Sequence, residues 1–331
     1  MWGLDKNDVR LFSGQAHPAL AAGIASHLDI PLDPTYFSRF SNDNLYVQLG
    51  ASVRERRVYI VQSLIPPVSD NLMELLMMLD IARSAGASQI HAILPYFSYA
   101  RSDKKDAPRI SITARLVADL LATAGMTHFM TMTLHSPQVH GFFSTPTDPL
   151  TARHLFVRNI QDRRFDPTET VVVSPDIGRA KSAARFARHL GFMMAAAEKE
   201  RISDNQVIIG DAIERQIFGF RRAIIYDDEI VTGTTVLELC KILVHLGIEE
   251  IFVICTHGLF AGSALENLCR VPQIIHIITT DTVPIDESKK NPKLEILSVA
   301  PVFAEAIWRN ATRQSIGNLY TFHEEPEENL I

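Results

Sequence analysis

One stretch in the second half of the sequence combines groups that could bind a phosphorylated sugar. The apolar run 222–226 leads into two adjacent acids, Asp227 and Asp228, and a loop rich in Thr and Gly follows. Where the next helix begins, unpaired backbone N–H groups and the helix dipole favour an anion. Gly233 allows close approach of the backbone, and three threonines add hydroxyl donors, namely Thr232, Thr234 and Thr235. The paired carboxylates could hold sugar hydroxyls or a Mg²⁺ ion that bridges phosphates.

An ordinary capped turn between a strand and a helix is the alternative for this stretch. Two adjacent acids at the end of an apolar strand are costly without a partner, which favours a ligand. Two further polar side chains also follow apolar runs: His135 comes after 128–134, and Asp176 follows 170–174. In a parallel sheet both would lie at the carboxyl ends of strands, where ligands of such folds bind. For His135 a hydrogen-bonded histidine without a ligand is the alternative.

A polar segment, 198–205, places Lys199 and Arg201 between apolar runs. Taken alone, this segment is typical of a solvated hairpin with no catalytic role.

The elements that must position these groups alternate along the chain between short β-branched runs and longer amphipathic stretches. Such alternation is typical of βαβ units and mainly parallel sheets, so the sequence predicts an α/β fold. The predicted strands are 58–62, 89–94, 128–134, 170–174, 222–226, 250–256 and 274–278. The predicted helices are 71–84, 112–124, 178–190 and 234–246.

A turn-rich and charged stretch, 145–168, indicates a boundary between two domains of similar size. We therefore expect an N-terminal domain over 1–150, a C-terminal domain over 151–315 and a C-terminal tail over 316–331, in which the acidic stretch 323–329 is solvated. An internal duplication is compatible with the similar alternation of strand-like and helix-like runs in the two halves, although no sequence repeat demonstrates one.

Composition narrows the class of protein. The chain has 331 residues, and 32 basic against 38 acidic side chains give a net charge of −6. A protein whose main task is to neutralise a nucleic-acid backbone would be basic on at least one face. No run reaches the roughly 18 apolar residues that a membrane span requires, so neither nucleic acid nor membrane is expected as a partner. The three cysteines form no close pair and are expected to be buried free thiols in a reducing, cytoplasmic compartment: Cys240, Cys255 and Cys269.

The segment from Asp227 to Thr235 resembles the ribose-phosphate-binding signature of type I phosphoribosyltransferases. Further blocks, which occur in the order typical of the family, narrow the resemblance to ribose-phosphate diphosphokinases, also called phosphoribosyl pyrophosphate synthetases. These blocks are 70–76, 95–101, 134–135 with 141–143, 173–178, 199–201 and 256–260. The resemblance implies two similar phosphoribosyltransferase-like domains, each with a mainly parallel sheet flanked by helices.

The resemblance also implies an activity, a cofactor and a set of site residues. The family transfers the diphosphoryl group of Mg-ATP to the anomeric hydroxyl of ribose 5-phosphate and leaves AMP. By this resemblance His135 and Asp176 are associated with Mg²⁺, and Lys199 and Arg201 are catalytic. Ribose 5-phosphate would be bound by Arg201, Asp227, Asp228, Val231, Thr232, Gly233, Thr234 and Thr235. ATP would be bound by Phe40, Asn42, Asn44, Arg101, Ser102, Asp103 and His135.

In the family a neighbouring subunit supplies the hairpin that matches Phe40, Asn42 and Asn44. The resemblance therefore implies self-association, with a hexamer built from dimers as the usual assembly. An ordinary core position is the alternative for Phe40.

Several positions depart from the common family pattern. Asn44 stands where many members have Glu, Ser102 where they have Gln, Thr133 and Val231 where they have Asp, and Arg179 and Thr234 where they have Gly. Val231 cannot accept hydrogen bonds from ribose hydroxyls, and the loss of one such partner costs about 1–3 kcal/mol. The departures leave two other functions open: a catalytically weak paralogue that regulates a true synthetase, and a phosphoribosyltransferase that consumes the activated sugar.

Overall fold

The computed structural model describes residues 4–5, 7–197, 199–203, 206–209 and 211–320, and side chains are described outside 198–212. The C-terminal tail expected over 316–331 lies outside the described residues from 321 onward. The chain divides into two compact units. The first unit contains Met1–Thr151, Thr282–Pro284 and Ser298–Ile331, and the second contains Ala152–Asp281 and Ile285–Leu297.

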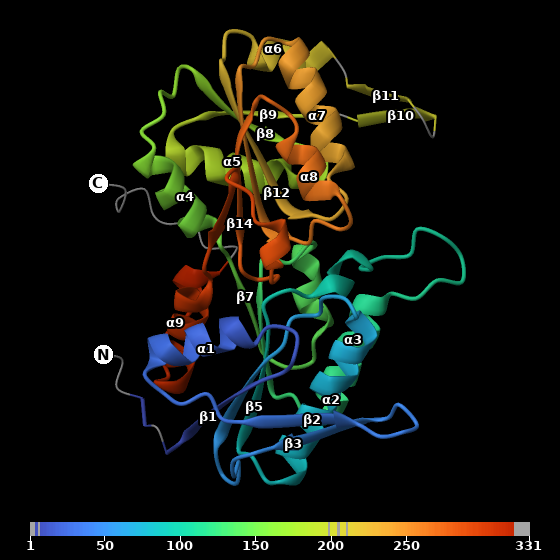
Figure 1. The fold of residues 1–331 in the computed structure, drawn as a ribbon, viewed down its shortest axis with the longest axis vertical. Coiled ribbons are helices and arrows are strands. Elements are labelled where there is room, and N and C mark those ends of the chain that lie inside the picture. Colours follow the sequence, from blue (N-terminus) through green and yellow to red (C-terminus); the bar gives the residue numbers. More distant parts are fainter. Residues whose placement is uncertain (1–3, 6, 198, 204–205, 210, 321–331) are drawn as a thin grey trace. The chain divides into compact units, whose positions relative to one another are not determined.

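The first unit is built on a five-stranded parallel sheet with the strand order β1-β4-β5-β6-β7. Its strands are β1 (Val9–Ser13), β4 (Arg57–Val61), β5 (Gln89–Leu94), β6 (His128–Met132) and β7 (Thr147–Leu150). Helices α1 (Pro18–Leu28) and α9 (Ala300–Ala311) lie on one side, and α2 (Val68–Ser84) and α3 (Thr113–Ala124) on the other (Figure 1). A separate antiparallel hairpin joins β2 (Thr35–Arg39) to β3 (Leu45–Leu49).

Helix α9 returns to the first unit after the chain has built the second. It packs on α1, and a Cβ added at Gly23 of α1 would lie 3.1 Å from Cβ of Ala300. The predicted C-terminal domain extended to residue 315, whereas the structure assigns the residues from Ser298 onward to the first unit. The physical reason is that the apolar face of α9 is buried against a helix from the beginning of the chain.

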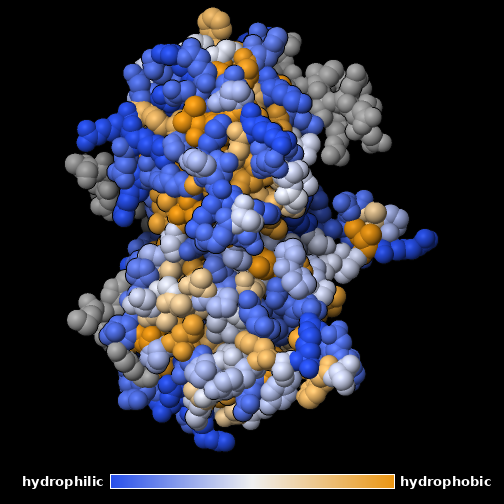
Figure 2. Space-filling view, viewed as in Figure 1, coloured by the Kyte–Doolittle hydropathy of each residue, from blue (hydrophilic) through white to orange (hydrophobic). Residues whose placement is uncertain are grey.

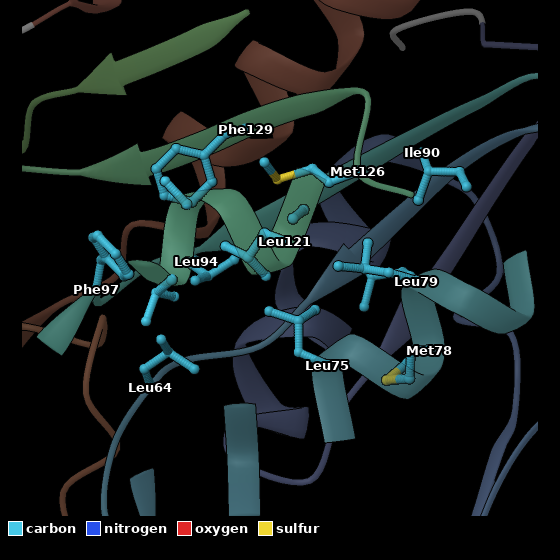
Figure 3. Packing of buried hydrophobic residues seen from close by; sticks show 14 of the residues in the cluster. Leu64, Leu75, Met78, Leu79, Ile90, Leu94, Phe97, Leu121, Met126 and Phe129 are labelled. Atoms are coloured by element: carbon cyan, nitrogen blue, oxygen red, sulfur yellow. The ribbon is translucent and has the colours of Figure 1, made fainter. Parts of the chain in front are cut away.

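The core between α2, α3 and the sheet is filled by large apolar side chains (Figure 3). Phe129 on β6 is fully buried, stacks on Phe143 with ring centroids 4.1 Å apart and meets Phe97 edge-on at 5.8 Å. Leu75 and Leu79 of α2 are also fully buried in this cluster. These residues recur at the spacing of one helical face, which is why the sequence predicts a helix there.

The second unit is built on a six-stranded sheet with the order β15-β14-β13-β12-β8-β9, and all its pairs are parallel. The strands are β8 (Thr170–Ser174), β9 (Met193–Ala196), β12 (Arg222–Ile230), β13 (Glu250–Gly258), β14 (Ile274–Thr280) and β15 (Leu294–Leu297). Helices α4 (Arg153–Asp162) and α5 (Ala180–Leu190) pack together, as do α7 (Thr234–His245) and α8 (Ala264–Cys269), and α6 (Asp211–Ile217) packs near β9. The predicted α/β class with parallel sheets and flanking helices is therefore confirmed.

The strand order of the second sheet reverses between β8 and β12. From β8 the chain first adds β9 on one side and later adds β12, β13, β14 and β15 on the other. Loops at the carboxyl ends of two such strands diverge to opposite sides, and this divergence creates the crevice in which α/β folds bind ligands. The segments that follow β8 and end β12 carry Asp176 and the acid pair Asp227 and Asp228.

Two smaller features bear on the sequence predictions. No helix among the described residues combines the length and the apolar character that crossing a membrane requires. Cys240 and Cys255 are buried free thiols, as predicted, and Cys269 is half-buried. Burial raises the pKa of the Cys240 thiol to about 12, so this side chain stays protonated and packs as a small apolar group.

Phe129→Ala should destabilise the first unit by about 3–5 kcal/mol, because the change removes a stacked ring from a closely packed core and leaves a cavity. Leu116→Ala, on the exposed face of α3, is the matched control and should change the free energy of unfolding by less than about 0.5 kcal/mol. Urea denaturation of both variants measures the difference. Equal stabilities would contradict the assignment of Phe129 to the core.

Candidate active site

The acid pair lies on a part of β12 that extends beyond its neighbour β8. Strand β12 pairs with β8 only from Arg222 to Ile225, but it pairs with β13 as far as Ile230. Asp227 and Asp228 therefore have a paired strand on one side and the mouth of the crevice on the other. The sequence predicted a strand that ends at 226. The strand continues because β13 still supplies hydrogen-bond partners to its backbone.

Arg179 connects the turn after β8 to this acid pair. The turn is a single 3-10 helix, η3 (Ile177–Arg179), and the Asp176 carboxylate caps it by accepting the Arg179 backbone N–H at 2.9 Å. The Arg179 guanidinium donates to Oδ2 of Asp228 at 2.5 Å, and the two side chains are 13% and 6% exposed. One residue thus contacts both the acid of the β8 turn and an acid of β12.

The half-buried carboxyl of Asp227 has a pKa well above its usual range. Burial is the larger cause, and the negative charge of Asp228 beside it is the second. Oδ1 of Asp227 also accepts the backbone N–H of Asp228 at 2.8 Å. A carboxyl in this state is poised to bind hydroxyl groups, because it gains more than a solvated acid from any donor that replaces lost water.

The loop after β12 leads into the amino end of α7. Gly233 has φ of +73°, the left-handed conformation that favours glycine, and it directly precedes the helix. The hydroxyls of Thr232 and Thr234 lie 3.2 Å apart, and both side chains are exposed. The structure therefore brings together exposed hydroxyls and the backbone N–H groups at the start of a helix, as an anion site requires.

The segment after β13 holds this loop in place. The carbonyl of Ile230 accepts N–H groups from Leu259 and Phe260, and the carbonyl of Val231 accepts that of Ala261 at 2.8 Å. A Cβ added at Gly258 would lie 2.4 Å from the ring of Phe260, so only glycine fits there. The family-like block 256–260 is therefore a support for the loop after β12.

Lys199 and Arg201 lie on β10 (Lys199–Ser203), which pairs with β11 (Gln206–Ile209) as an antiparallel ribbon. The sequence predicted a polar loop between apolar strands. The side chains of both residues lie outside those that the structure describes, so their catalytic role stays a prediction.

In the first unit, Phe40, Asn42 and Asn44 lie on the turn between β2 and β3. The backbone N–H of Phe40 donates to the carbonyl of Asn44 at 2.9 Å, and the Phe40 ring is 58% exposed. Its only ring contact among the described residues is an edge-on one with Tyr46 at 5.9 Å. The alternative of a core position for Phe40 is therefore excluded within this chain.

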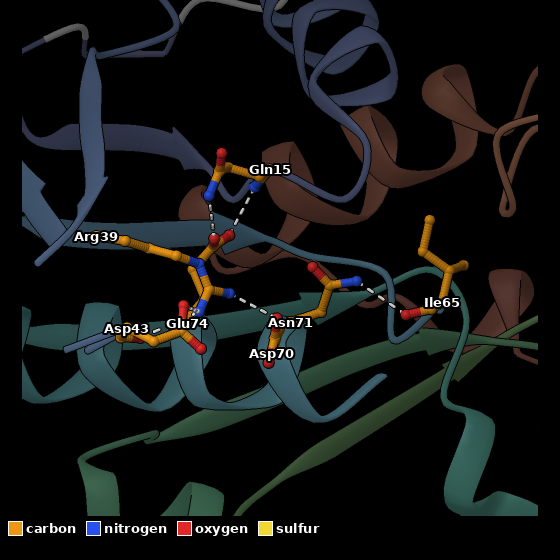
Figure 4. Close-up of polar contacts among 7 residues, drawn as sticks. All are labelled: Gln15, Arg39, Asp43, Ile65, Asp70, Asn71 and Glu74. Atoms are coloured by element: carbon orange, nitrogen blue, oxygen red, sulfur yellow. Dashed lines mark hydrogen bonds and ion pairs between the residues drawn. The ribbon is translucent and has the colours of Figure 1, made fainter. Parts of the chain in front are cut away.

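Side chains of Arg39 and Glu74 connect α2 to the hairpin and to the loop at Gln15 (Figure 4). Arg39, the last residue of β2, donates to the Asp43 carboxylate at 2.9 Å within the turn and to the Asp70 carboxylate of α2 at 2.6 Å. One turn further along α2, the buried Glu74 carboxylate accepts the backbone N–H of Gln15 at 2.6 Å and the Gln15 side-chain amide at 2.8 Å. The family-like block 70–76 therefore positions neighbouring loops.

Arg101, Ser102 and Asp103 lie at the base of a loop between η1 (Ser98–Arg101) and α3. The Ser102 hydroxyl accepts the backbone N–H of Thr113 at 3.2 Å, which closes the loop at its base. The loop projects from the first unit (Figure 1), and Figure 2 shows both hydrophilic and hydrophobic residues on it. Arg101 is exposed, and the Asp103 carboxylate accepts a weak 3.5 Å hydrogen bond from Gln138. Ser102 thus has a structural role here.

His135 follows β6 after a strained turn. Thr133 has φ of +42°, a conformation that is unfavourable for a β-branched residue, and its N–H donates to the carbonyl of Leu150 at 2.9 Å. Backbone strain of this kind is often found at functional sites. His135 itself is half-buried. It belongs to the first unit and Asp176 to the second.

Sequence reasoning did not identify Arg179 or Arg39 as site residues. Arg179 was visible as a departure from a glycine, but its partner Asp228 lies 49 positions away. Arg39 contacts Asp70 across 31 positions. Neither pairing leaves a local pattern that spacing alone could reveal.

The chain resembles known proteins along nearly its whole length. Residues 9–125 match a family described as the N-terminal domain of ribose phosphate pyrophosphokinase, and residues 207–321 match the phosphoribosyl synthetase-associated domain. The ribose-phosphate pyrophosphokinase of Deinococcus radiodurans is 42% identical over 323 residues, with 96% of this chain and 99% of the relative covered. A Streptomyces coelicolor protein named as a candidate ribose-phosphate pyrophosphokinase is 49% identical over 317 residues, with 95% and 98% covered.

The chain belongs to the ribose-phosphate pyrophosphokinase family. Among solved structures, phosphoribosylpyrophosphate synthetase from Mycobacterium smegmatis matches with a TM-score of 0.85 and 36% identity, covering 92% of this chain and 99% of that one. The family and the enzyme class that the sequence predicted are therefore confirmed.

Asp227→Asn should stabilise the metal-free protein at neutral pH. The pKa of the Asp227 carboxyl is higher in the folded than in the unfolded state, so the folded protein gives up stability as the pH rises and the proton leaves. The amide variant escapes this loss, and its melting temperature should exceed that of the wild type by more at pH 8 than at pH 5.

The control is Asp286→Asn in the same unit, because hydrogen bonds from Ser288 lower the pKa of the Asp286 carboxyl. This variant should show no gain at pH 8. A wild-type protein that is as stable as Asp227→Asn at pH 8 would refute the raised pKa of Asp227.

Proposed function

We propose that the chain transfers the β,γ-diphosphoryl group of Mg-ATP to the anomeric hydroxyl of ribose 5-phosphate, giving 5-phosphoribosyl 1-diphosphate and AMP. The observation that carries this proposal is the placement of the acid pair, the threonine loop and the start of α7 beside the β8 turn, where the strand order reverses. At the end of one strand, that arrangement places carboxylates that can accept hydrogen bonds from sugar hydroxyls and N–H groups that can bind a phosphate. The first unit then supplies the ATP-binding residues and the second the sugar-phosphate residues.

The proposed ribose site uses the segment from Asp227 to Thr235. The 5-phosphate would lie at the amino end of α7, with hydroxyls from Thr232, Thr234 and Thr235 and a close backbone at Gly233. The ribose hydroxyls would donate to the acid pair. Val231 contributes packing and no hydrogen bond, so the remaining acids carry the sugar contact.

The donor set fits Mg²⁺ held mainly by substrate. Among the described residues no group of three or more His, Cys, Asp and Glu side chains gathers in a way that could hold a metal ion. Mg²⁺ commonly keeps several waters and takes one or two carboxylates together with substrate phosphates. The exposed Asp176 carboxylate at the end of β8 suits this role, and we place His135 beside the nucleotide phosphates, because an imidazole is a less favoured ligand for Mg²⁺.

Charge neutralisation and positioning would supply most of the catalysis. When bound, Mg²⁺ would screen the phosphate oxygens from the incoming hydroxyl. Asp227 and Asp228 would orient the sugar, and Lys199 and Arg201 would stabilise charge that builds up on the transferred group.

The proposed ATP site joins residues of the first unit. Arg101, Ser102 and Asp103 lie at the base of one loop, and Phe40, Asn42 and Asn44 form an exposed hairpin turn that suits contact with a second copy of the chain. We propose self-association, with a hexamer built from dimers, so that the hairpin of one subunit completes the ATP site of its neighbour. The buried free thiols suit a reducing compartment, and we propose that the enzyme works in the cytoplasm.

The product distinguishes this function from the two alternatives. Purified protein is mixed with ATP, Mg²⁺ and ribose 5-phosphate, and the products are followed by ³¹P NMR and chromatography. The proposal predicts equal amounts of AMP and 5-phosphoribosyl 1-diphosphate. Absence of AMP at every substrate level, with retained binding to another synthetase chain, would indicate the regulatory paralogue. Release of pyrophosphate from supplied 5-phosphoribosyl 1-diphosphate and a base would indicate the transferase.

Lys199→Ala should lower kcat about 10²–10³-fold, because a cation fixed against developing charge is worth roughly 3–4 kcal/mol in the transition state. The fold should be unchanged, since β10 lies in a separate two-stranded ribbon. Lys241→Ala on the exposed surface of α7 is the matched control and should keep wild-type turnover. Near-normal turnover of Lys199→Ala would remove this residue from catalysis.

Asp70→Ala should raise the KM for ATP several-fold and leave the KM for ribose 5-phosphate unchanged. The change removes the carboxylate that holds Arg39 against α2, so the hairpin turn with Phe40 loses one anchor. Asp80→Ala breaks the Arg83–Asp80 ion pair on the same helix and should leave both constants unchanged. If both variants behave alike in steady-state kinetics, the hairpin anchor has no part in nucleotide binding.

A further inference from the structure

Arg179 stands out among the charged side chains near the ribose loop. The guanidinium donates to Oδ2 of Asp228 at 2.5 Å, and the backbone N–H of the same residue donates to the Asp176 carboxylate at 2.9 Å. The side chains of Arg179 and Asp228 are 13% and 6% exposed, so water screens this ion pair weakly.

The ion pair lies where β12 has lost its pairing with β8. The ladder between β12 and β8 ends at the pair Ile225 and Val173, and beyond it β12 pairs with β13 alone. Asp228 belongs to this singly paired part. The guanidinium of Arg179 reaches it from the turn after β8, and so replaces the missing ladder with a link between side chains.

The acids around the link make a cation useful there. Asp176 follows β8, and Asp227, Asp228 and Glu229 lie near the end of β12. The Arg179 guanidinium pairs with Asp228, and its positive charge lowers the repulsion that a dianionic sugar phosphate meets on approach. Its planar fork also fixes the orientation of the carboxylate that it contacts, which an ammonium group would do less well.

We propose that Arg179 is a positioning residue for ribose 5-phosphate, which holds Asp228 and the carboxyl end of β12 against the turn that carries Asp176. The inference rests on the proposed function. Arg179 acts through Asp228, and the site is organised before the sugar arrives. Loss of such preorganisation weakens ground-state binding of the sugar phosphate, whereas the proposed ATP-binding residues and the cationic side chains of Lys199 and Arg201 belong to other segments.

The test compares Arg179→Ala, Arg179→Gln and Arg179→Lys with the wild type. The KM for ribose 5-phosphate should rise about tenfold or more in the Ala and Gln variants, while kcat and the KM for ATP stay within about threefold. Arg179→Lys keeps the charge without the fork and should fall between them and the wild type. Calorimetric titration of ribose 5-phosphate in the absence of ATP should show the same order of affinities.

The matched control is Arg222→Ala. It breaks the Arg222–Glu250 ion pair at the opposite end of the same strand, where the contact is 2.6 Å and Arg222 is likewise mostly buried. This variant should have a lower melting temperature and a wild-type KM for the sugar. If Arg179→Ala fails to fold, Arg179→Gln and Arg179→Lys carry the comparison.

Two results would overturn the inference. One is a sugar KM within twofold of the wild type in the folded Arg179 variants, and the other is an equal rise in Arg222→Ala. A wild-type protein that binds ribose 5-phosphate but makes no AMP would refute the proposed function alone, and the calorimetric comparison would still decide the role of Arg179.

Discussion

Strand β12 continues beyond the point where its neighbour β8 stops pairing with it, and this difference determines the geometry of the proposed site in the second unit. The pairing of β8 with β12 ends at Val173, while β12 continues to Ile230. The acid pair is therefore flanked by β13 on one side and has no paired strand on the other. Burial of carboxylates is unfavourable without partners. The partners that offset this cost are Arg179, backbone N–H groups and, in the proposed function, the hydroxyls of a bound sugar.

The same edge explains why residues far apart in the sequence serve one site. The block 256–260 supports the loop after β12 through the carbonyls of Ile230 and Val231, and glycine at 258 allows the ring of Phe260 to approach. In the first unit the equivalent task falls to contacts of α2, where Asp70 and Glu74 fix the hairpin and the loop at Gln15. Each unit thus uses buried or paired polar groups to hold the loops that the proposed reaction needs.

The elements that local patterns predicted match the structure closely, whereas α1, α9, β1 and β15 were not among them. The predicted strands 89–94 and 170–174 coincide with β5 and β8, and α7 begins at Thr234 as predicted. The apolar run gave no sign that β12 continues through polar residues, because that depends on pairing with β13. The return of α9 to the first unit depends on its fit to α1, and the contact of Arg179 with Asp228 spans 49 positions. The family-like motifs led to the candidate site segments, and the roles of the residues in them stay predictions.

Hydrogen–deuterium exchange followed by mass spectrometry tests most directly whether the sugar phosphate occupies the crevice between β8 and β12. The protein is compared with and without ribose 5-phosphate, in the presence of Mg²⁺ and the absence of nucleotide. We expect slower exchange in peptides from both 174–180 and 228–237, and no change in β4 of the first unit. Unchanged exchange in both segments while calorimetry shows that the sugar is bound would contradict the account.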